Sequence, residues 1–194
     1  NGKAVTEVPV RAAGQESALN MTTPKLKVVR VAFVGLGMRG HDAVERWTHI
    51  PGIQVMALCD YERDRAERCQ EYLRKASMPA ADIYSGEDGY KELCKRKDID
   101  LVYIAPDWKH HFLVAYEAMN NGKHVAVEVP AAMNLTEIWK LIDISEKKRL
   151  HCMMLENCCY DFFELNSLNM AQKDVFGEIL YVQGAYRHEL SKFW

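Results

Sequence analysis

The sequence lacks the features of membrane-spanning, disordered and nucleic-acid-coating proteins. No apolar run approaches the roughly 18 residues of a membrane span, and the longest runs, such as residues 31–34, have the length of a strand. Neither sign of charge is in excess, because 25 Lys and Arg stand against 27 Asp and Glu in 194 residues. A nucleic-acid partner is therefore not expected. With 48% hydrophobic residues and no repeat or low-complexity tract, the chain is expected to fold around a buried core.

The sequence also lacks a cysteine pattern of the kind that binds metal or forms a disulfide framework. Its six cysteines follow irregular spacings, with no Cys-x-x-Cys pair and no paired histidines to complete a zinc site. Cys59 and Cys152 fall in apolar, strand-like runs, where a free thiol behaves as a small hydrophobe. The adjacent Cys158 and Cys159 are poorly placed for a relaxed mutual disulfide. We therefore expect no metal site, and we expect most of the thiols to be free and buried.

The first 24 residues differ in composition from the rest of the chain. They mix Gly, Ala, Ser, Thr and charged residues without a sustained period and end in Thr22-Thr23-Pro24, which is typical of an extended leader. An organised domain is expected to begin at Lys25. Because the first residue is Asn rather than Met, an export signal upstream of it would not be visible. The compartment therefore stays open between the cytoplasm and the periplasm.

From Lys25 onward, short β-branched runs alternate with longer amphipathic segments. This alternation is typical of βαβ units and of a parallel sheet that is covered on both faces. The sequence predicts an α/β fold, a doubly wound parallel sheet of the Rossmann type, over residues 25–157. Its strands are expected near residues 27–34, 53–59, 81–84, 99–104, 123–128 and 151–156, and its helices near residues 38–49, 61–76, 87–96, 109–121 and 134–148.

A glycine motif follows the first predicted strand and opens the first predicted helix. In this motif, GLGMRG at residues 35–40, the first glycine allows a tight turn, the second lets backbone approach a pyrophosphate, and the third lets helix pack on strand. Asp60 ends the second strand, 20 residues after Gly40, where dinucleotide sites use a carboxylate to hold the adenine ribose. The pattern favours a dinucleotide site. The alternative is a structural turn, with Asp60 as a helix cap.

The same carboxylate bears on which dinucleotide binds. Asp60 would repel the 2′-phosphate of NADP, so the sequence favours NAD. Two nearby cations, Arg39 and Arg63, act in the opposite direction and keep NADP as the alternative.

A cluster of polar and aromatic residues stands at the end of the fourth predicted strand, over residues 104–111. Ligands of doubly wound sheets bind at the carboxyl ends of the strands, so this position favours a functional role. Trp108 could close over a nicotinamide, and His111 could donate a hydrogen bond. The alternatives are a buried aromatic residue and a histidine at the start of a helix.

Two more clusters, at residues 128–130 and 156–160, follow the fifth and sixth predicted strands. They converge on the same edge of the sheet. Glu128, Asn157 and Tyr160 could orient a ribose and a sugar there. The alternative is that these side chains cap helices and make hydrogen bonds within loops.

Taken together, these segments resemble the Gfo/Idh/MocA family. The features that carry the resemblance are the glycine motif, the strand that ends at Asp60, the strand followed by a His, and a Glu-x-Pro after a further strand. Residues 128–132, 155–160 and 184–186 more narrowly resemble glycoside hydrolase family 109, the NAD-dependent α-N-acetylgalactosaminidases. The resemblance covers about residues 25–190.

The resemblance implies roles for individual residues. Asp60 would hold the adenine ribose, and the glycine turn would hold the pyrophosphate. Tyr186 would face the substrate and Tyr160 would act as an acid–base group, with His188, on the same strand face as Tyr186, as a second candidate. The residues implied to contact NAD are Gly35, Gly37, Met38, Arg39, Gly40, Asp60, Trp108, Lys109, His110, His111, Glu128, Val129 and Asn157.

One position departs from the ordinary dehydrogenases that the sequence resembles, which carry Glu-Lys-Pro with a lysine that moves protons at the oxidised carbon. Here Val129 cannot titrate, which agrees with the glycosidase branch. The reaction implied for that branch oxidises C3 of the sugar transiently, removes the C2 proton as the C1 substituent leaves, adds water and returns the hydride. A second departure is Pro106-Asp107, where relatives usually carry Thr-Pro.

Beyond residue 157 the resemblance implies the start of a second, α+β domain with an open antiparallel sheet. Its first elements are expected within residues 158–194, as a helix near residues 161–173 and a strand near residues 178–190. We therefore expect the chain to be the amino-terminal part of a longer protein. Pairing of subunits into a homo-oligomer through that sheet stays open.

Three classes of function remain under consideration. The first is an NAD-dependent glycosidase that acts on a sugar without net formation of NADH. The second is a net sugar dehydrogenase, which would reduce added NAD. The third is a nucleotide-binding protein without turnover.

Overall fold

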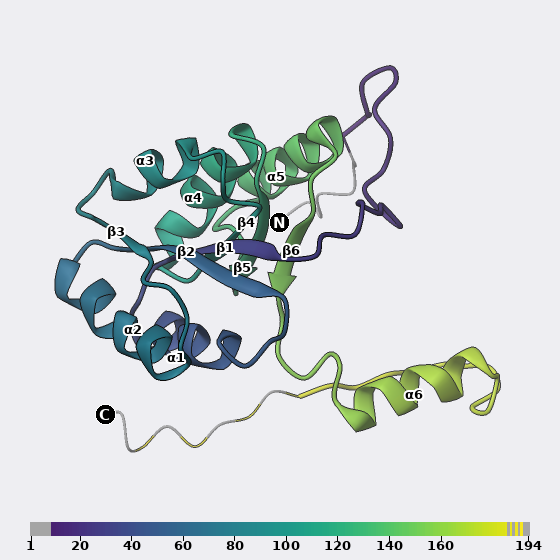
Figure 1. Ribbon diagram of the computed structural model, residues 1–194. Helices are drawn as coiled ribbons and strands as arrows, with labels where there is room; N and C mark the ends of the chain where they lie inside the picture. Colours follow the sequence, from purple (N-terminus) through teal and green to yellow (C-terminus); the bar gives the residue numbers. More distant parts are fainter. Residues whose placement is uncertain (1–8, 186, 188, 190, 192–194) are drawn as a thin grey trace. The chain divides into compact units, whose positions relative to one another are not determined.

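The computed structural model of the protein describes residues 9–185, 187, 189 and 191 (Figure 1). The chain divides into two units, Asn1–Leu155 and Glu156–Trp194. Each unit is described by itself.

The first unit is a parallel sheet with helices on both faces. Its strands pair in the order β3-β2-β1-β4-β5-β6, and every pairing is parallel. The strands are β1 (Val29–Val34), β2 (Ile53–Asp60), β3 (Asp82–Ser85), β4 (Leu101–Ile104), β5 (His124–Glu128) and β6 (Cys152–Leu155). The helices are α1 (Met38–Trp47), α2 (Arg63–Lys75), α3 (Gly89–Lys95), α4 (Trp108–Asn120) and α5 (Leu135–Lys148). The predicted doubly wound fold is confirmed.

Alternation along the strands sends side chains into two separate hydrophobic cores. In β1, Ala32 and Val34 pack on one face with α3, α4 and α5, whereas Val31 and Phe33 pack on the other with α1 and α2. Figure 1 shows these two layers of helices on opposite sides of the sheet. Because both faces are covered, the strands are nearly continuous apolar runs. The packed core therefore holds the carboxyl ends of the strands, and the loops that leave them, in fixed positions.

The described cysteines are free thiols. Cys59, Cys69 and Cys94 are buried, and burial is the main cause that raises the pKa of Cys59 to about 12 and that of Cys69 to about 11. These three side chains therefore stay neutral and pack as small hydrophobes. The adjacent Cys158 and Cys159 are exposed.

Within the part of the chain that the structure describes, no cluster of His, Cys, Asp and Glu is arranged to hold a metal ion. In that same part, no helix combines the length and the apolar character needed to cross a membrane.

Residues 9–24, the described part of the predicted leader, form no helix or strand, and an ion pair fastens this segment to α5. The guanidinium of Arg11 donates to both carboxylate oxygens of Glu146, at 2.8 Å from Nη2 to Oε1 and 2.9 Å from Nε to Oε2. The side-chain amide of Gln15 donates to the same carboxylate at 2.8 Å. The Glu146 side chain is only 3% exposed beneath these partners. The extended leader is thus anchored through one carboxylate.

We expect Glu146→Gln to release the leader from α5. The hydrogen bonds from Arg11 lower the pKa of Glu146 from 4.5 to about 2. A lowered pKa means that the folded protein stabilises the ionised carboxylate of Glu146. The anchor should therefore persist at neutral pH and weaken as the pH falls from 4.5 toward 2. Trypsin must take the Arg11 side chain into its own pocket, so cleavage after Arg11 at neutral pH should become several-fold faster in the variant.

The matched control is Asp143→Asn on the same helix, which removes an exposed pair with Lys147 instead. Exposed pairs of this kind contribute little to stability. Equal cleavage rates after Arg11 in the wild type and in Glu146→Gln would show that the anchor does not hold the leader.

The second unit contains the predicted helix but not the predicted strand. Helix α6 (Phe162–Gln172) agrees with the helix expected near residues 161–173. Residues 178–185 form no strand, so the strand expected near residues 178–190 is wrong where the structure describes it. A strand is held by hydrogen bonds to a neighbouring strand, and the described residues of this unit provide none. Tyr186 and His188 lie outside the described residues.

Candidate cofactor-binding site

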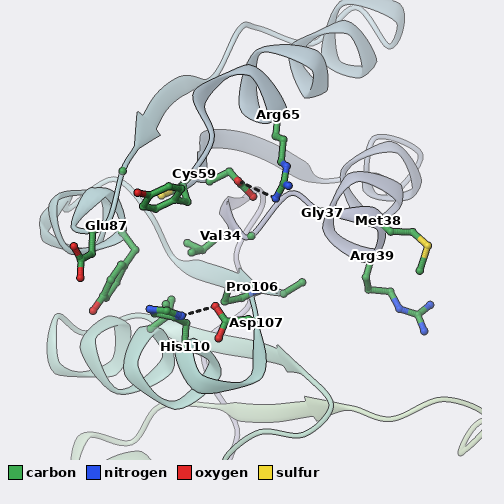
Figure 2. A pocket seen from close by; sticks show the side chains of 17 residues that line it. Val34, Gly37, Met38, Arg39, Cys59, Arg65, Glu87, Pro106, Asp107 and His110 are labelled. Carbon is green, nitrogen blue, oxygen red and sulfur yellow. Dashed lines mark hydrogen bonds and ion pairs between the residues drawn. The ribbon is translucent and has the colours of Figure 1, made fainter.

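The carboxyl ends of β1, β2, β3 and β4 surround one cavity of the first unit (Figure 2). Its volume is about 730 Å³, within the range of small-molecule sites. The order of the strands reverses between β1 and β4, and ligands of doubly wound sheets bind at such a point. In Figure 2, Arg65 and His110 lie on opposite sides of the cavity, with Gly37, Met38 and Arg39 along a third. The cavity therefore lies where the sequence predicts a dinucleotide site.

The three glycines of the turn after β1 differ in what surrounds them. Gly35 has a φ of +86°, and a Cβ on it would lie 2.2 Å from the backbone nitrogen of Pro106. A Cβ on Gly40 would lie 1.8 Å from the carbonyl oxygen of Gly35. A Cβ on Gly37 would meet nothing within 4 Å. The first and third glycines are thus required by packing, while Gly37 presents bare backbone to the cavity that it lines.

Helix α1 begins at the cavity without a cap. Its N-cap residue is Gly37, no side chain accepts a hydrogen bond from the first turn, and the first turn contains no acidic residue. The N–H groups of an uncapped first turn carry partial positive charge, and the exposed guanidinium of Arg39 adds a full charge nearby. This end of the helix is suited to an anionic group such as a pyrophosphate.

Asp60 joins the end of β2 to the glycine turn. One carboxylate oxygen accepts the N–H of Leu36 at 2.6 Å, and the other accepts the N–H of Glu62 at 3.0 Å and a guanidinium hydrogen of Arg65 at 3.4 Å. The side chain is 5% exposed. A carboxylate offers roughly four lone-pair positions, so three donors leave one acceptor position for a ligand. The arrangement therefore supports the turn and still fits a ribose hydroxyl.

The cation beside Asp60 is Arg65, which the sequence did not single out. Arg65 lies in the first turn of α2 and lines the cavity. Arg63, the residue considered from the sequence, pairs with Glu67 at 2.9 Å on the exposed face of that helix. The only signal in the sequence for Arg65 is its position five residues after Asp60. Which arginine reaches the carboxylate is decided by the rotation of α2 about its axis.

We expect Arg65→Ala to sharpen the preference for NAD over NADP. The change leaves the Asp60 carboxylate without its neighbouring cation, so repulsion of a 2′-phosphate increases. The ratio of the NADP and NAD dissociation constants should rise roughly tenfold, which corresponds to about 1.4 kcal/mol. This is a modest share of the interaction energy of about 4 kcal/mol between two unit charges 4 Å apart near a protein surface. Isothermal titration with each dinucleotide measures the ratio, and Arg63→Ala is the matched control. An equal change of this ratio in both variants would contradict the conclusion that Arg65, rather than Arg63, is the cation that acts on Asp60.

The loop after β4 supplies another wall of the cavity. Asp107 caps α4 by accepting the N–H of Lys109 at 3.0 Å, and its other oxygen bonds the ring of His110, which lines the cavity. Trp108 is 61% exposed and does not line the cavity, and neither does Lys109. Of the four residues predicted here, His110 therefore faces the cavity directly.

His111, the fourth of these residues, is buried and bonds a different loop. Its exposed fraction is 2%, and its Nδ1 donates to the carbonyl oxygen of Pro130 at 2.7 Å. A carbonyl only accepts, so Nδ1 carries the proton in this arrangement. His111 thereby ties the start of α4 to the turn after β5, which contains the exposed Val129.

Glu128 ends β5 and has partners from two other elements. Its Oε1 accepts a hydrogen bond from the phenol of Tyr103 in β4 at 2.6 Å. Its Oε2 lies 3.9 Å from Nε of Arg39 in α1. The predicted Glu128 and Arg39 are thus brought together. Asn157 and Tyr160 belong to the second unit, where both are exposed.

The segment after β3 also contributes residues that were not predicted. Glu87 and Tyr90 follow β3 and line the cavity. Their signal in the sequence is that they follow the third predicted strand, whose carboxyl end belongs to the same edge of the sheet. Cys59 also lines the cavity, and because burial raises its pKa to about 12, it remains a neutral thiol. Burial thus disfavours the reactive thiolate form of Cys59.

Comparisons with known proteins agree with an NAD-binding fold. The family model GFO_IDH_MocA, "Oxidoreductase family, NAD-binding Rossmann fold", matches residues 29–156. Over 193 residues the chain is 67% identical to glycosyl hydrolase family 109 protein 5 of Phocaeicola vulgatus, covering 100% of this chain and 37% of that protein. Over 190 residues it is 64% identical to glycosyl hydrolase family 109 protein 1 of Bacteroides fragilis, covering 97% of this chain and 41% of that protein.

The chain also resembles solved structures at low sequence identity, and this resemblance shows the fold alone. The myo-inositol dehydrogenase from Lactobacillus casei, solved in complex with NAD(H) and myo-inositol, superposes with a TM-score of 0.66 at 22% identity. The match covers 77% of this chain and 43% of that chain. The chain thus spans less than half the length of each of these relatives.

Proposed function

The chain belongs to the Gfo/Idh/MocA family of oxidoreductases, whose Rossmann fold binds NAD, and on this basis we propose that the whole protein is an NAD-dependent enzyme that acts on a sugar glycoside. The activity that we propose is that of an α-N-acetylgalactosaminidase. The observation that carries the proposal is the 67% identity, over the whole chain, to a protein named glycosyl hydrolase family 109 protein 5. Because the chain spans 37% of that relative, substrate contacts from the remaining length form part of the proposal.

The residues of the first unit fit NAD. The open backbone at Gly37 and the uncapped first turn of α1 suit the pyrophosphate, and Asp60 keeps an acceptor position for the adenine ribose. When bound, NAD supplies reversible uptake of a hydride from a substrate carbon. The further contacts that we propose around the cofactor are Met38, Arg39, Trp108, Lys109, His110, Glu128, Val129 and Asn157. The contact implied for His111 is corrected, because its side chain is buried and bonded to Pro130.

Tyr160 is proposed as the group that accepts and returns the proton during the reaction. Val129 has no titratable group, so a lysine-type proton shuttle directly after Glu128 is not available to this protein. In the proposal, Tyr160 takes the C2 proton next to the oxidised C3 as the C1 substituent leaves, and gives it back when water adds. Tyr186 is proposed to face the substrate, with His188 as a second acid–base candidate.

The test is an assay of the whole protein with a nitrophenyl N-acetyl-α-galactosaminide, in which nitrophenol and NADH absorbance are followed in one cuvette. Release of nitrophenol without accumulating NADH is the expected result, because the hydride returns to the sugar in every turnover. NADH formation in proportion to oxidised sugar, without release, would replace the proposal with a net sugar dehydrogenase. Binding of NAD with neither signal would leave a nucleotide-binding protein without turnover.

A further inference from the structure

A buried phenol stands behind the cofactor-binding edge of the sheet. Tyr103 lies in β4, is 2% exposed and does not line the cavity. The ring of Phe33 lies 5.2 Å from its ring, and that of Trp47 lies 5.5 Å away in an edge-on arrangement. Phe33 and Trp47 also pack edge-on at 5.5 Å. These aromatic contacts leave the Tyr103 ring one position in the core, so the place of its hydroxyl is set by packing.

The sheet register aims this hydroxyl at Glu128. Tyr103 pairs with Ala126 of β5, so Glu128, two residues further along, presents its side chain on the same face of the sheet. The separation of 2.6 Å between the phenol oxygen and Oε1 is that of a charge-assisted O–H···O⁻ bond. Burial is the main cause that raises the pKa of Tyr103, and the hydrogen bond to Glu128 raises it further. The phenol therefore remains protonated and keeps donating.

The second oxygen of Glu128 faces the cofactor-binding turn. Oε2 lies 3.9 Å from Nε of Arg39, in the first turn of α1. The Glu128 side chain is 17% exposed, whereas that of Arg39 is 52% exposed. The three side chains thus run from the core to the rim of the site, and only the middle one touches both of the others. A carboxylate on a side chain with three rotatable bonds would not keep this position without a fixed partner.

We propose that Tyr103 is a positioning residue for the cofactor site, because it holds Glu128 and, through that carboxylate, the guanidinium of Arg39. The inference rests on the proposed contacts of Glu128 and Arg39 with the cofactor. Tyr103 itself is buried and does not line the cavity. Its hydrogen bond restricts the Glu128 side chain to one orientation. The conformational entropy of that side chain is therefore lost on folding rather than when NAD binds.

The test compares Tyr103→Phe, Glu128→Gln and the double variant in the whole protein. NAD affinity is measured by isothermal titration below the melting temperature of each variant, and thermal stability is measured separately. Tyr103→Phe keeps the aromatic packing and should weaken NAD binding by about fivefold or more, whereas adding it to Glu128→Gln should cause little further loss. Such coupling in affinity would not arise if Tyr103 only stabilised the core.

The matched control is Tyr116→Phe, a partly buried tyrosine of α4 whose ring packs on Phe112 and which does not line the cavity. It should leave NAD affinity unchanged. Wild-type affinity in Tyr103→Phe would overturn the proposal, as would wild-type affinity in Glu128→Gln or equal losses from Tyr103→Phe in both backgrounds. Absence of glycosidase activity alongside the expected coupling would overturn the proposed function and leave this inference standing.

Discussion

Gly40→Ala is expected to unfold the first unit or to lower its melting temperature by about 10 °C or more. The added Cβ would lie 1.8 Å from the carbonyl oxygen of Gly35, and that oxygen is part of the backbone of a tight turn. A flexible side chain could move away, but this turn is packed against the loop after β4 at Pro106. We therefore expect a loss of at least about 4 kcal/mol, in the range that only a few specific mechanisms reach. Thermal unfolding followed by circular dichroism measures it.

Gly37→Ala is the matched control in the same turn and separates packing from binding. Gly37 has a φ of −67°, which alanine adopts without strain, and its Cβ would meet nothing within 4 Å. The cost at an N-cap is at most about 1 kcal/mol. NAD affinity, however, should fall about tenfold or more, because the new methyl group occupies the space through which backbone approaches the pyrophosphate. Normal stability of Gly40→Ala, or undiminished NAD binding in Gly37→Ala, would contradict this division of roles.

Tyr160→Phe is expected to lower kcat for nitrophenol release by about 10²–10⁴-fold, the usual contribution of a positioned acid–base group. The substitution removes only the hydroxyl that we propose to carry the proton. Because the change removes one hydroxyl and adds no atom, the variant should keep a melting temperature close to that of the wild type. NAD affinity should also be unchanged, so the loss appears in kcat at saturating cofactor. Steady-state kinetics of the whole protein, with NAD titrations beside them, measure both quantities.

Tyr181→Phe provides the control for this experiment. Tyr181 belongs to the same unit and is 78% exposed, so its hydroxyl is equally accessible. Full activity is expected in that variant. If Tyr160→Phe retains wild-type kcat, the proton is carried by another group, and His188 becomes the residue to replace.

The fold could be predicted from local patterns because each element of the first unit is coded by neighbouring residues. The apolar run of β1 and the amphipathic pattern of α1 can each be recognised within 6 and 10 consecutive residues. Strands that are covered on both faces of the sheet also keep long apolar runs. The strand expected near residues 178–190 had the same local appearance. It is absent over residues 178–185, because a strand also requires a neighbour, which no local pattern provides.

By itself, the sequence determined the doubly wound fold and the place of the dinucleotide site, because turn glycines, strand lengths and Asp60 at the end of the second strand act over short stretches of chain. Only the tertiary structure decided which side chains meet. Arg65 rather than Arg63 reaches Asp60, Tyr103 bonds Glu128 across 25 residues, and Arg11 pairs with Glu146 across 135. The physical reason is that helix rotation and strand register are set by packing of the whole core, which places distant residues together.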